Sequence, residues 1–201
     1  MGLWLADTPL VLASGSAVRR QLLEAAGIPV EVRPASLDER EVEASAPRDD
    51  PSAVATLLAR AKAVRIAGKF PGRLVVGADQ TLALGSRRFD KPADRAAARA
   101  QLQALAGRTH ELHAAIAVAR DDKVLFEHVA VARLSMRSLS DGFLDRYLAA
   151  AGANITASVG AYQLERLGVH LFDHIDGDHF TILGLPLLPL LAYLRAEGSL
   201  A

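Results

Sequence analysis

The sequence predicts an α/β protein with a mixed, twisted sheet flanked by helices. Short apolar runs typical of buried strands alternate along the chain with segments whose apolar residues recur at helical spacing. In the middle of the chain, two strand-like runs, 109–120 and 123–137, are joined by Asp121-Asp122 as in a hairpin. Because a hairpin pairs its strands antiparallel, we do not expect a purely parallel sheet. The chain of 201 residues is long enough for one sizeable core, so we expect a single domain over residues 1–201.

Apolar periodicity and turn residues divide the chain into expected elements. Strands are expected at 10–12, 30–33, 74–78, 82–84, 109–120, 123–137 and 180–183. Helices are expected at 17–26, 51–67, 94–106, 141–151 and 187–196. Residues 38–50 are polar, and we expect them to form a loop or a short exposed turn.

Composition excludes several classes of protein. Acidic and basic residues balance at 23 each, so nothing favours a nucleic-acid partner or an anionic membrane surface. The absence of cysteine excludes a disulfide framework and a thiolate-ligated metal. The N-terminal MGLWLADTPL lacks the basic region and apolar core of a signal peptide, and no run approaches the ~18 apolar residues of a membrane span. We therefore expect a cytoplasmic protein without a membrane partner.

Residues 10–27 carry the first candidate site. The apolar run Leu10–Leu12 reads as a buried strand, and Ser16 is placed to cap the helix that follows. Arg19 and Arg20 fall in the first turn of that helix, where the helix dipole disfavours cations by ~0.3–1 kcal/mol. Backbone N–H groups, the hydroxyls of Ser14 and Ser16 and two guanidinium groups would suit a phosphate chain. The alternative is an ordinary strand-to-helix turn with two solvated arginines.

Asp79 is the second candidate. It follows the buried run 74–78 directly, and a carboxylate is costly to bury unless it is paired or bound to a metal. Ligands of α/β sheets bind at strand ends, so Asp79 could share one edge of the sheet with the Ser16 loop. The alternative is an aspartate that only caps the following turn.

Lys62 lies on the expected helix 51–67. The buried stripe of this helix is expected to consist of Val54, Leu57, Leu58, Ala61 and Val64. Lys62 is four residues from both Leu58 and Ile66, which places it at the border of the apolar face. A border lysine usually extends its ammonium to solvent, so the helix alone gives it no role.

Several other patterns do not amount to sites. The Asp79-x-Thr81 pair lacks the aspartate that the haloacid dehalogenase motif needs at position 77, which is glycine. Neither a Walker A motif nor a G-x-G-x-x-G fingerprint is present. His110 and His113 are three apart on an expected strand and so point to opposite faces. The acidic and histidine-rich segment 173–179 does not fit the EF-hand spacing, and we interpret it as structural.

The successive motifs of the chain resemble those of the Maf nucleotide pyrophosphatases. The resemblance extends from Leu10 to about Leu194 and rests on LASGSAVRR, ARAKA, VVGADQTLAL with FDKP, GRTHELHAA, GAYQLERLGVHLF and IDGDHFTILGLPL, in that order. It implies the fold of the inosine triphosphate pyrophosphatases (Ham1), with a cleft between two lobes. It also implies hydrolysis of nucleoside triphosphates to monophosphate and pyrophosphate, a divalent metal (Mg²⁺ or Mn²⁺), and a homodimer.

The resemblance also implies roles for individual residues. Asp79 would be the proton acceptor and a metal ligand, with Glu39 or the adjacent Asp38 as the other acidic residue at the metal. The phosphate-binding residues would be Ser14, Ser16, Arg19, Arg20, Lys62 and Lys91. Val18, Gln80 and Glu165 would occupy the positions that set base specificity.

The chain departs from the commonest family pattern between Ser16 and Arg19. Two residues, Ala17 and Val18, stand where that pattern has one proline. The longer spacing and the Asp79-Gln80 pair resemble the branch that acts on 7-methylguanosine triphosphate. That branch carries an aromatic residue at the position of Val18, so the base preference is left open.

We therefore predict a nucleotide pyrophosphatase that splits the α–β phosphoanhydride of a nucleoside triphosphate and that could remove modified nucleotides. One alternative is a non-catalytic nucleotide-binding regulator of cell division or septum formation, because Maf proteins are also linked to that process. This alternative would need the basic residues but not Asp79. The other alternative is a metal-dependent phosphomonoesterase, which would release orthophosphate.

Overall fold

The computed structural model describes residues 2–45 and 50–201, and the chain divides into two compact units. The first unit comprises the chain up to Gln80, Ala114–Ala130 and Gly184–Ala201. The second comprises Thr81–His113 and Val131–Leu183. The prediction of one domain over residues 1–201 stays a prediction.

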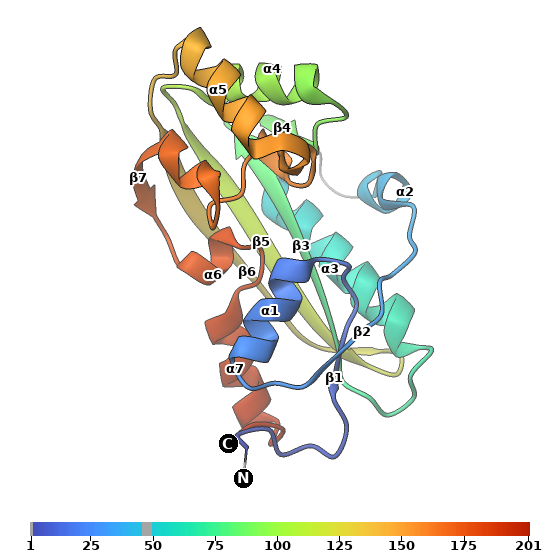
Figure 1. Ribbon diagram of the computed structural model, residues 1–201. Helices are drawn as coiled ribbons and strands as arrows, with labels where there is room; N and C mark the ends of the chain where they lie inside the picture. The colour runs from blue at the N-terminus through green and yellow to red at the C-terminus, as the bar shows by residue number, and fades with distance from the viewer. Residues whose placement is uncertain (1, 46–49) are drawn as a thin grey trace. The chain divides into compact units, whose positions relative to one another are not determined.

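The sheet has seven strands and is mixed, as predicted (Figure 1). Its order is β2-β1-β3-β5-β6-β7, with β4 paired to β3 outside this path. The strand β1 pairs in parallel with β2 and β3, whereas the β3–β4 and β6–β7 pairs are antiparallel. The strands are β1 (Leu10–Leu12), β2 (Val30–Val32), β3 (Val75–Leu84), β4 (Arg87–Phe89), β5 (Thr109–Arg120), β6 (Lys123–Met136) and β7 (Phe172–Asp176).

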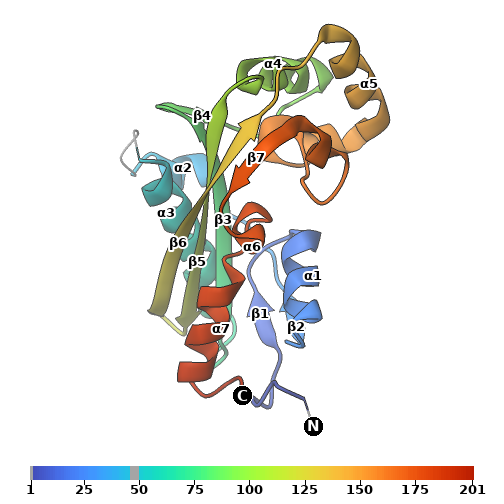
Figure 2. The same ribbon diagram turned by 90° about the vertical axis from the view of Figure 1, so that its left-hand side faces the viewer.

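Helices flank the sheet of the first unit on both sides. Figures 1 and 2 show α3 on one face of these strands and α1 and α7 on the other. No described helix has the length and apolar content needed to cross a membrane. The α-helices are α1 (Ala17–Ala25), α2 (Glu39–Glu43), α3 (Pro51–Ala67), α4 (Arg95–Leu105), α5 (Asp141–Ala151), α6 (His179–Ile182) and α7 (Leu187–Ala196), and the 3₁₀ helices are η1 (Gly152–Thr156), η2 (Val159–Ala161) and η3 (Leu167–Leu171).

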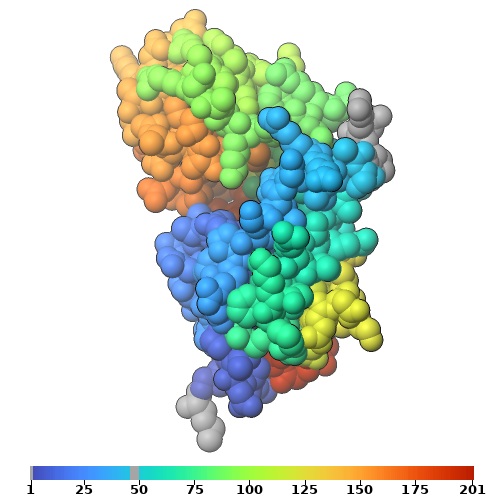
Figure 3. All heavy atoms as spheres, turned by 90° about the vertical axis from the view of Figure 1, so that its right-hand side faces the viewer, coloured from blue at the N-terminus to red at the C-terminus, as the bar shows by residue number. Residues whose placement is uncertain are grey.

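The two ends of the chain meet within the first unit. Trp4 and Leu200 form an isolated antiparallel bridge, and the amide of Leu5 donates to the carbonyl of Ser199 at 2.9 Å. In Figure 3 the blue N-terminal segment lies against the red C-terminal residues. Backbone hydrogen bonds therefore anchor the segment that leads into β1.

Most expected elements are confirmed, and the helix caps explain where the helices begin. Ser16, Asp50, Asp94 and Ser140 each accept a hydrogen bond from a backbone amide in the first turn of the following helix. Such caps satisfy amides that have no partner inside the helix. The hairpin at Asp121-Asp122 is also confirmed, with Asp121 in the left-handed region at φ 58°.

Three of the expected elements are wrong. Residues 39–43 form α2 rather than a loop or a short exposed turn, because Asp38 caps them. Residues 46–49 of the expected loop lie outside the described residues. Residues 180–183 do not form a strand: Asp178 caps the helix α6 there, and a short apolar run cannot by itself separate strand from helix. The strand of this region is instead β7, inside the acidic segment, where it pairs with Arg133–Met136 of β6.

The third error concerns β3, which the sequence divides into two runs around Asp79. The structure has one strand from Val75 to Leu84, with Asp79 in its interior. Its first half pairs with β1, and its second half pairs with β4, Leu82 opposite Phe89. The carboxylate does not end the strand because an ammonium compensates its burial, as described below.

Candidate active site

The loop after β1 is built around two serine hydroxyls. Ser14 follows the parallel pairing of β1 with β3 and is buried, and its Oγ accepts a hydrogen bond from the amide of Ser16 at 3.3 Å. Ser16 Oγ accepts from the amide of Arg19 at 3.4 Å, which makes Ser16 the N-cap of α1 as predicted. The two serines thus fix the turn that carries the chain from strand to helix.

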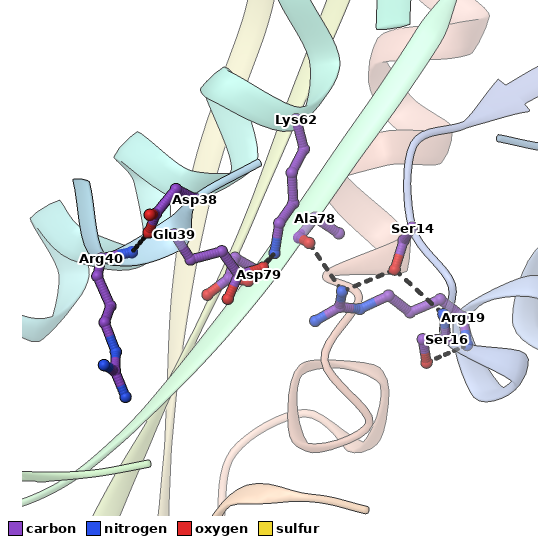
Figure 4. A network of polar contacts seen from close by, with 9 residues as sticks. All are labelled: Ser14, Ser16, Arg19, Asp38, Glu39, Arg40, Lys62, Ala78 and Asp79. Carbon is purple, nitrogen blue, oxygen red and sulfur yellow. Dashed lines mark hydrogen bonds and ion pairs between the residues drawn. The ribbon is translucent and has the colours of Figure 1, made fainter. Parts of the chain in front are cut away.

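Arg19 turns inward from the first turn of α1. Its Nε donates to the carbonyl of Gly184 at 2.8 Å, and its Nη1 donates to Ser14 Oγ at 3.0 Å and to the carbonyl of Ala78 at 2.7 Å. Figure 4 shows the guanidinium between the Ser14 loop and β3. Burial lowers the pKa of Arg19, whereas the charges of Asp79 and Glu39 raise it. A guanidinium nevertheless stays charged in proteins.

Small residues bring α3 unusually close to β3. A Cβ atom on Gly77 would lie 2.2 Å from the carbonyl oxygen of Ala59 and 2.6 Å from the amide nitrogen of Ala63, so only glycine fits. The buried face of α3 is accordingly centred on Ala55, Ala59 and Ala63. Of the predicted stripe, Val54 and Leu58 are buried, whereas Leu57, Ala61 and Val64 are only partly buried. This rotation places Lys62 on the buried face and corrects its expected place at the border.

Lys62 links two carboxylates from different elements. Its Nζ lies 2.5 Å from Asp79 Oδ1 and 2.7 Å from Glu39 Oε1 (Figure 4). Lys62 and Asp79 are each only 9% exposed, whereas the Glu39 side chain is about half exposed. Removing one partner of a buried ion pair costs about 3–5 kcal/mol, because the other charge is left uncompensated. The three charged groups therefore form one mutually dependent cluster.

The cluster distinguishes the two acidic residues that the sequence left open. Asp38 Oδ1 accepts from the amides of Arg40 and Glu41, so this carboxylate caps α2. Glu39 instead extends to Lys62 and thereby lies beside Asp79. Among the described residues, no group of three or more histidine and acidic side chains is arranged to hold a metal ion. Asp79 and Glu39 still offer two hard oxygen donors, and Mg²⁺ is often bound by one or two carboxylates together with substrate phosphates.

Other predicted site residues lie outside these contacts. Arg20 is exposed, and its Nε lies 3.8 Å from Glu24 one helical turn away. Val18 and Gln80 are partly buried in the first unit, on α1 and β3. Lys91 and Glu165 are exposed residues of the second unit. The structure thus joins Ser14, Ser16 and Arg19 in one set of contacts and Glu39, Lys62 and Asp79 in another, and Arg19 reaches β3 at Ala78, the residue before Asp79. It leaves Arg20, Lys91 and Glu165 accessible to solvent.

Gly184 is a participant that the sequence reasoning missed. Its backbone is in the left-handed region at φ +83°, and a Cβ there would lie 3.2 Å from Arg19 Nη2. The only sequence signal is a glycine after the apolar residues 182–183, and such a glycine is more often a helix terminus. Nothing local indicates that its carbonyl accepts from an arginine 165 residues away.

The patterns set aside from the sequence are structural in the fold. His110 points into the core of the second unit, and its Nε2 shares a hydrogen bond with Tyr162 Oη at 2.8 Å. His113 lies on the opposite side of the strand from His110, and its Nε2 is 3.2 Å from Glu111 Oε2. In the segment 173–179, Asp178 caps α6 and the other acidic residues lie on β7.

Comparison with known proteins identifies the family. The model of the family described as "Maf-like protein" matches residues 9–197, nearly the whole chain. The chain belongs to the Maf family. Its relatives include a "Nucleoside triphosphate pyrophosphatase" of Rhodopseudomonas palustris (strain BisB18), which is 56% identical over the full length of both chains.

Another relative of this Maf-family chain carries a more specific name. It is a "7-methyl-GTP pyrophosphatase" of Mesorhizobium japonicum, 52% identical over 95% of this chain and 97% of the relative. Among solved structures, the chain is similar to a HAM1 protein from Coxiella burnetii, with 19% identity, a TM-score of 0.41, and coverage of 64% of this chain and 72% of that one.

Proposed function

We infer that this Maf protein hydrolyses nucleoside triphosphates to nucleoside monophosphate and pyrophosphate. The observation that carries the proposal is the Glu39–Lys62–Asp79 cluster beside the Ser14–Arg19 turn, in a chain that shares 52–56% of its residues with relatives named for this activity. A binding protein without catalysis would need basic residues alone. A buried carboxylate on a strand, paired with the ammonium of Lys62, is instead what a hydrolytic reaction requires.

The residues divide the chemistry of phosphoanhydride hydrolysis between them. Asp79, whose Oδ1 is fixed by Lys62, is the proposed acceptor of the proton from the attacking water. The serine hydroxyls and the amides in the first turn of α1 are the proposed donors for phosphate oxygens. Arg20 and Lys91, which are exposed cations, are proposed to bind the triphosphate and the leaving pyrophosphate.

A divalent metal, Mg²⁺ or Mn²⁺, belongs to the proposal. The carboxylates of Asp79 and Glu39 would hold it, and Asp38 is the weaker candidate because it caps α2. When bound, such a metal neutralises phosphate charge and makes a coordinated water more acidic. Lys62 would continue to keep the two carboxylates near each other.

The base preference is a finer part of the proposal. Val18, Gln80 and Glu165 are the proposed specificity residues. The carboxylate of Glu165 accepts hydrogen bonds and suits the donor-bearing edge of guanine. Val18 cannot stack on a cationic methylated ring, a contact worth ~0.5–2 kcal/mol. We therefore propose a purine-tolerant site with weak discrimination in favour of 7-methylguanosine triphosphate. A cytoplasmic location and a homodimer, testable by imaging and by mass in solution, complete the proposal.

Product identification tests the reaction. The protein with Mg²⁺ or Mn²⁺ is incubated with guanosine, 7-methylguanosine, uridine and thymidine triphosphates, and phosphorus NMR identifies the products. Monophosphate and pyrophosphate in equal amounts are expected, with the purine substrates preferred. Orthophosphate as the first product would instead indicate a phosphomonoesterase, and binding without turnover would indicate a regulator.

Asp79→Asn tests the assignment of the base. The amide keeps the shape of the side chain but cannot accept a proton, so kcat should fall by ~10²–10⁴. Asp94→Asn is the matched control, because asparagine also caps helices and Asp94 caps α4 without any contact to the Glu39–Lys62–Asp79 cluster among the described residues. Near-wild-type kcat in folded Asp79→Asn would refute the assignment.

A further inference from the structure

Arg19 and Arg20 are neighbours in the first turn of α1, but the structure uses them differently. The guanidinium of Arg19 is engaged by three protein acceptors, which come from the loop after β1, from β3 and from the segment ahead of α7. The guanidinium of Arg20 is exposed and lies 3.8 Å from Glu24. A common role for the two arginines therefore does not follow from their adjacency.

The donor inventory of Arg19 limits what else it can bind. A guanidinium has five N–H donors, one on Nε and two on each terminal nitrogen. Strong arginine–phosphate contacts use two parallel donors, either from Nε and one terminal nitrogen or from both terminal nitrogens. Nε is bonded to Gly184, and Nη1 is bonded to both Ser14 and Ala78. Each of these paired edges thus already has one nitrogen committed to the protein.

The three acceptors of Arg19 are groups that the proposed reaction needs in fixed places. Ser14 Oγ is a proposed donor to phosphate, and it is the atom that orients the Ser16 amide. The Ala78 carbonyl belongs to the peptide bond that continues into Asp79, so a bond to it restrains the backbone of the proposed base. The Gly184 carbonyl is presented by a left-handed residue that approaches the guanidinium closely.

We propose that Arg19 is a positioning residue for the hydrolysis, which holds Ser14 and the Asp79 backbone in register, and that phosphate binding falls to Arg20. This proposal rests on the proposed function. It distinguishes two residues that the sequence treats as one basic pair. Loss of a positioning residue lowers kcat, because small displacements of reacting groups are costly, whereas loss of a phosphate ligand weakens binding.

The test compares Arg19→Lys with Arg20→Lys and Arg20→Ala in the intact chain. Lysine at position 19 keeps the charge but cannot serve three acceptors in one plane. We expect Arg19→Lys to lower kcat by ~10–100-fold, with KM and the Kd of inorganic pyrophosphate within about threefold of the wild type. Arg20→Ala should instead raise KM and the Kd of pyrophosphate by ~10-fold, and Arg20→Lys should restore much of that binding. A kcat for Arg19→Lys that stays near wild type while pyrophosphate binding weakens tenfold would overturn the proposal.

Gly184→Ala gives a second test that removes no charge. The added Cβ is strained at φ +83° and crowds Arg19 Nη2 at 3.2 Å, so it should displace the guanidinium. We expect the same selective loss of kcat, with pyrophosphate affinity unchanged. Wild-type kcat in folded Gly184→Ala would contradict the positioning role even if Arg19→Lys does not fold. If the wild-type chain fails to release pyrophosphate from any triphosphate, the proposed function fails first, and this outcome is separate from a wrong division of roles between Arg19 and Arg20.

Discussion

A core cluster of the first unit and the core cluster of the second unit are built from side chains of different size. The first-unit cluster that includes α3 consists mostly of alanine, although other buried residues of this unit, such as Leu10, Leu23 and Leu190, are large. The alanines come from α3, β5 and the residue after β1: Ala13, Ala55, Ala59, Ala63, Ala67, Ala115, Ala117 and Ala119. The core cluster of the second unit contains large residues, among them Leu102, Leu134, Leu144, Tyr147, Tyr162 and Leu171. Both clusters are close to fully buried, so they differ in the size of their side chains and not in burial.

This difference explains where the charged cluster can exist. Alanine and glycine allow the backbone of α3 to approach β3, and a lysine that departs from this helix then meets an aspartate within the strand. The core cluster of the second unit is filled by leucine and aromatic rings, and the buried polar pair His110–Tyr162 within it is uncharged. Small-residue packing thus supports the candidate site in the first unit, and large-residue packing stabilises the second unit.

The largest combined effect on stability and on kcat is expected from Gly77→Ala in the first unit. The added Cβ would lie 2.2 Å from a backbone oxygen of α3, and neither the helix nor the strand has a flexible atom that can yield. Overpacking usually costs about 1–3 kcal/mol, and this backbone clash should exceed that range. Urea unfolding should show the loss of stability, and kcat should fall with it because Lys62 and Asp79 are displaced.

Gly142→Ala is the matched control for this substitution. Gly142 lies in α5, and a Cβ there has no atom within 4 Å, so alanine should stabilise the helix by roughly 0.5–1 kcal/mol. Equal and small effects at the two glycines would show that α3 and β3 are not in close contact.

The same packing shows what the sequence could and could not predict. Most strands and helices followed from apolar periodicity and cap residues, and Ser16, Asp50 and Asp94 mark helix starts correctly, whereas the short elements β4, β7, α2 and α6 were not predicted. The predicted buried face of α3 was wrong in part. Val54 and Leu58 are buried as predicted, but the prediction weighted large side chains and missed Ala59 and Ala63, which pack against a glycine distant in sequence. The contact with β3 determines which face of α3 is buried, and the apolar periodicity of the helix does not reveal that contact.

The residues of the candidate site were easier to predict from the sequence than the contacts between them. Asp79 stood out because a carboxylate follows a buried run, and its actual place within a continuous strand depends on Lys62 from another element. The choice of Glu39 over Asp38 depends on which side chain caps α2, which adjacent acidic residues do not reveal. Arg19 and Arg20 are equivalent in the sequence, and only the long-range acceptors at Ala78 and Gly184 distinguish them.

Leu134→Ala in the second unit should affect catalysis less than Gly77→Ala does, although it should lower stability strongly. Leu134 lies on β6, is fully buried, and belongs to the large-residue core. Its truncation should lower the free energy of unfolding by about 2–5 kcal/mol, because the cavity cannot close fully. At temperatures where the variant is folded, kcat should stay near wild type.

Leu125→Ala, on the same strand, is the control for Leu134→Ala. Leu125 is 40% exposed, so its truncation removes little buried area and should cost less than about 1 kcal/mol. A fall in kcat for Leu134→Ala as large as that for Gly77→Ala would contradict the separation of packing roles between the two cores.

The smallest effect at neutral pH is expected from substitution of His110, the buried histidine of the second unit. Its effect on the free energy of unfolding should grow as the pH falls. His110 is 1% exposed, packs beside the rings of Tyr162 and Phe172, and shares a hydrogen bond with the phenol of Tyr162. Burial lowers the pKa of His110 from 6.5 to about 4. The unfolded chain therefore binds a proton at a higher pH than the folded chain does, and stability falls wherever only the unfolded state is protonated.

The sign of the pH dependence follows from this order of pKa values. The contribution of His110 to stability is complete above about pH 6.5, is lost as the pH falls from about 6.5 to about 4, and levels off below. The loss should reach roughly 3 kcal/mol at most. Urea unfolding across this range should show a shallower pH dependence for His110→Gln, which keeps a partner for Tyr162 but does not titrate. The surface substitution His170→Gln should leave the wild-type dependence unchanged. An identical pH dependence in wild type and His110→Gln would mean that the large-residue core leaves this imidazole as easy to protonate as in the unfolded chain.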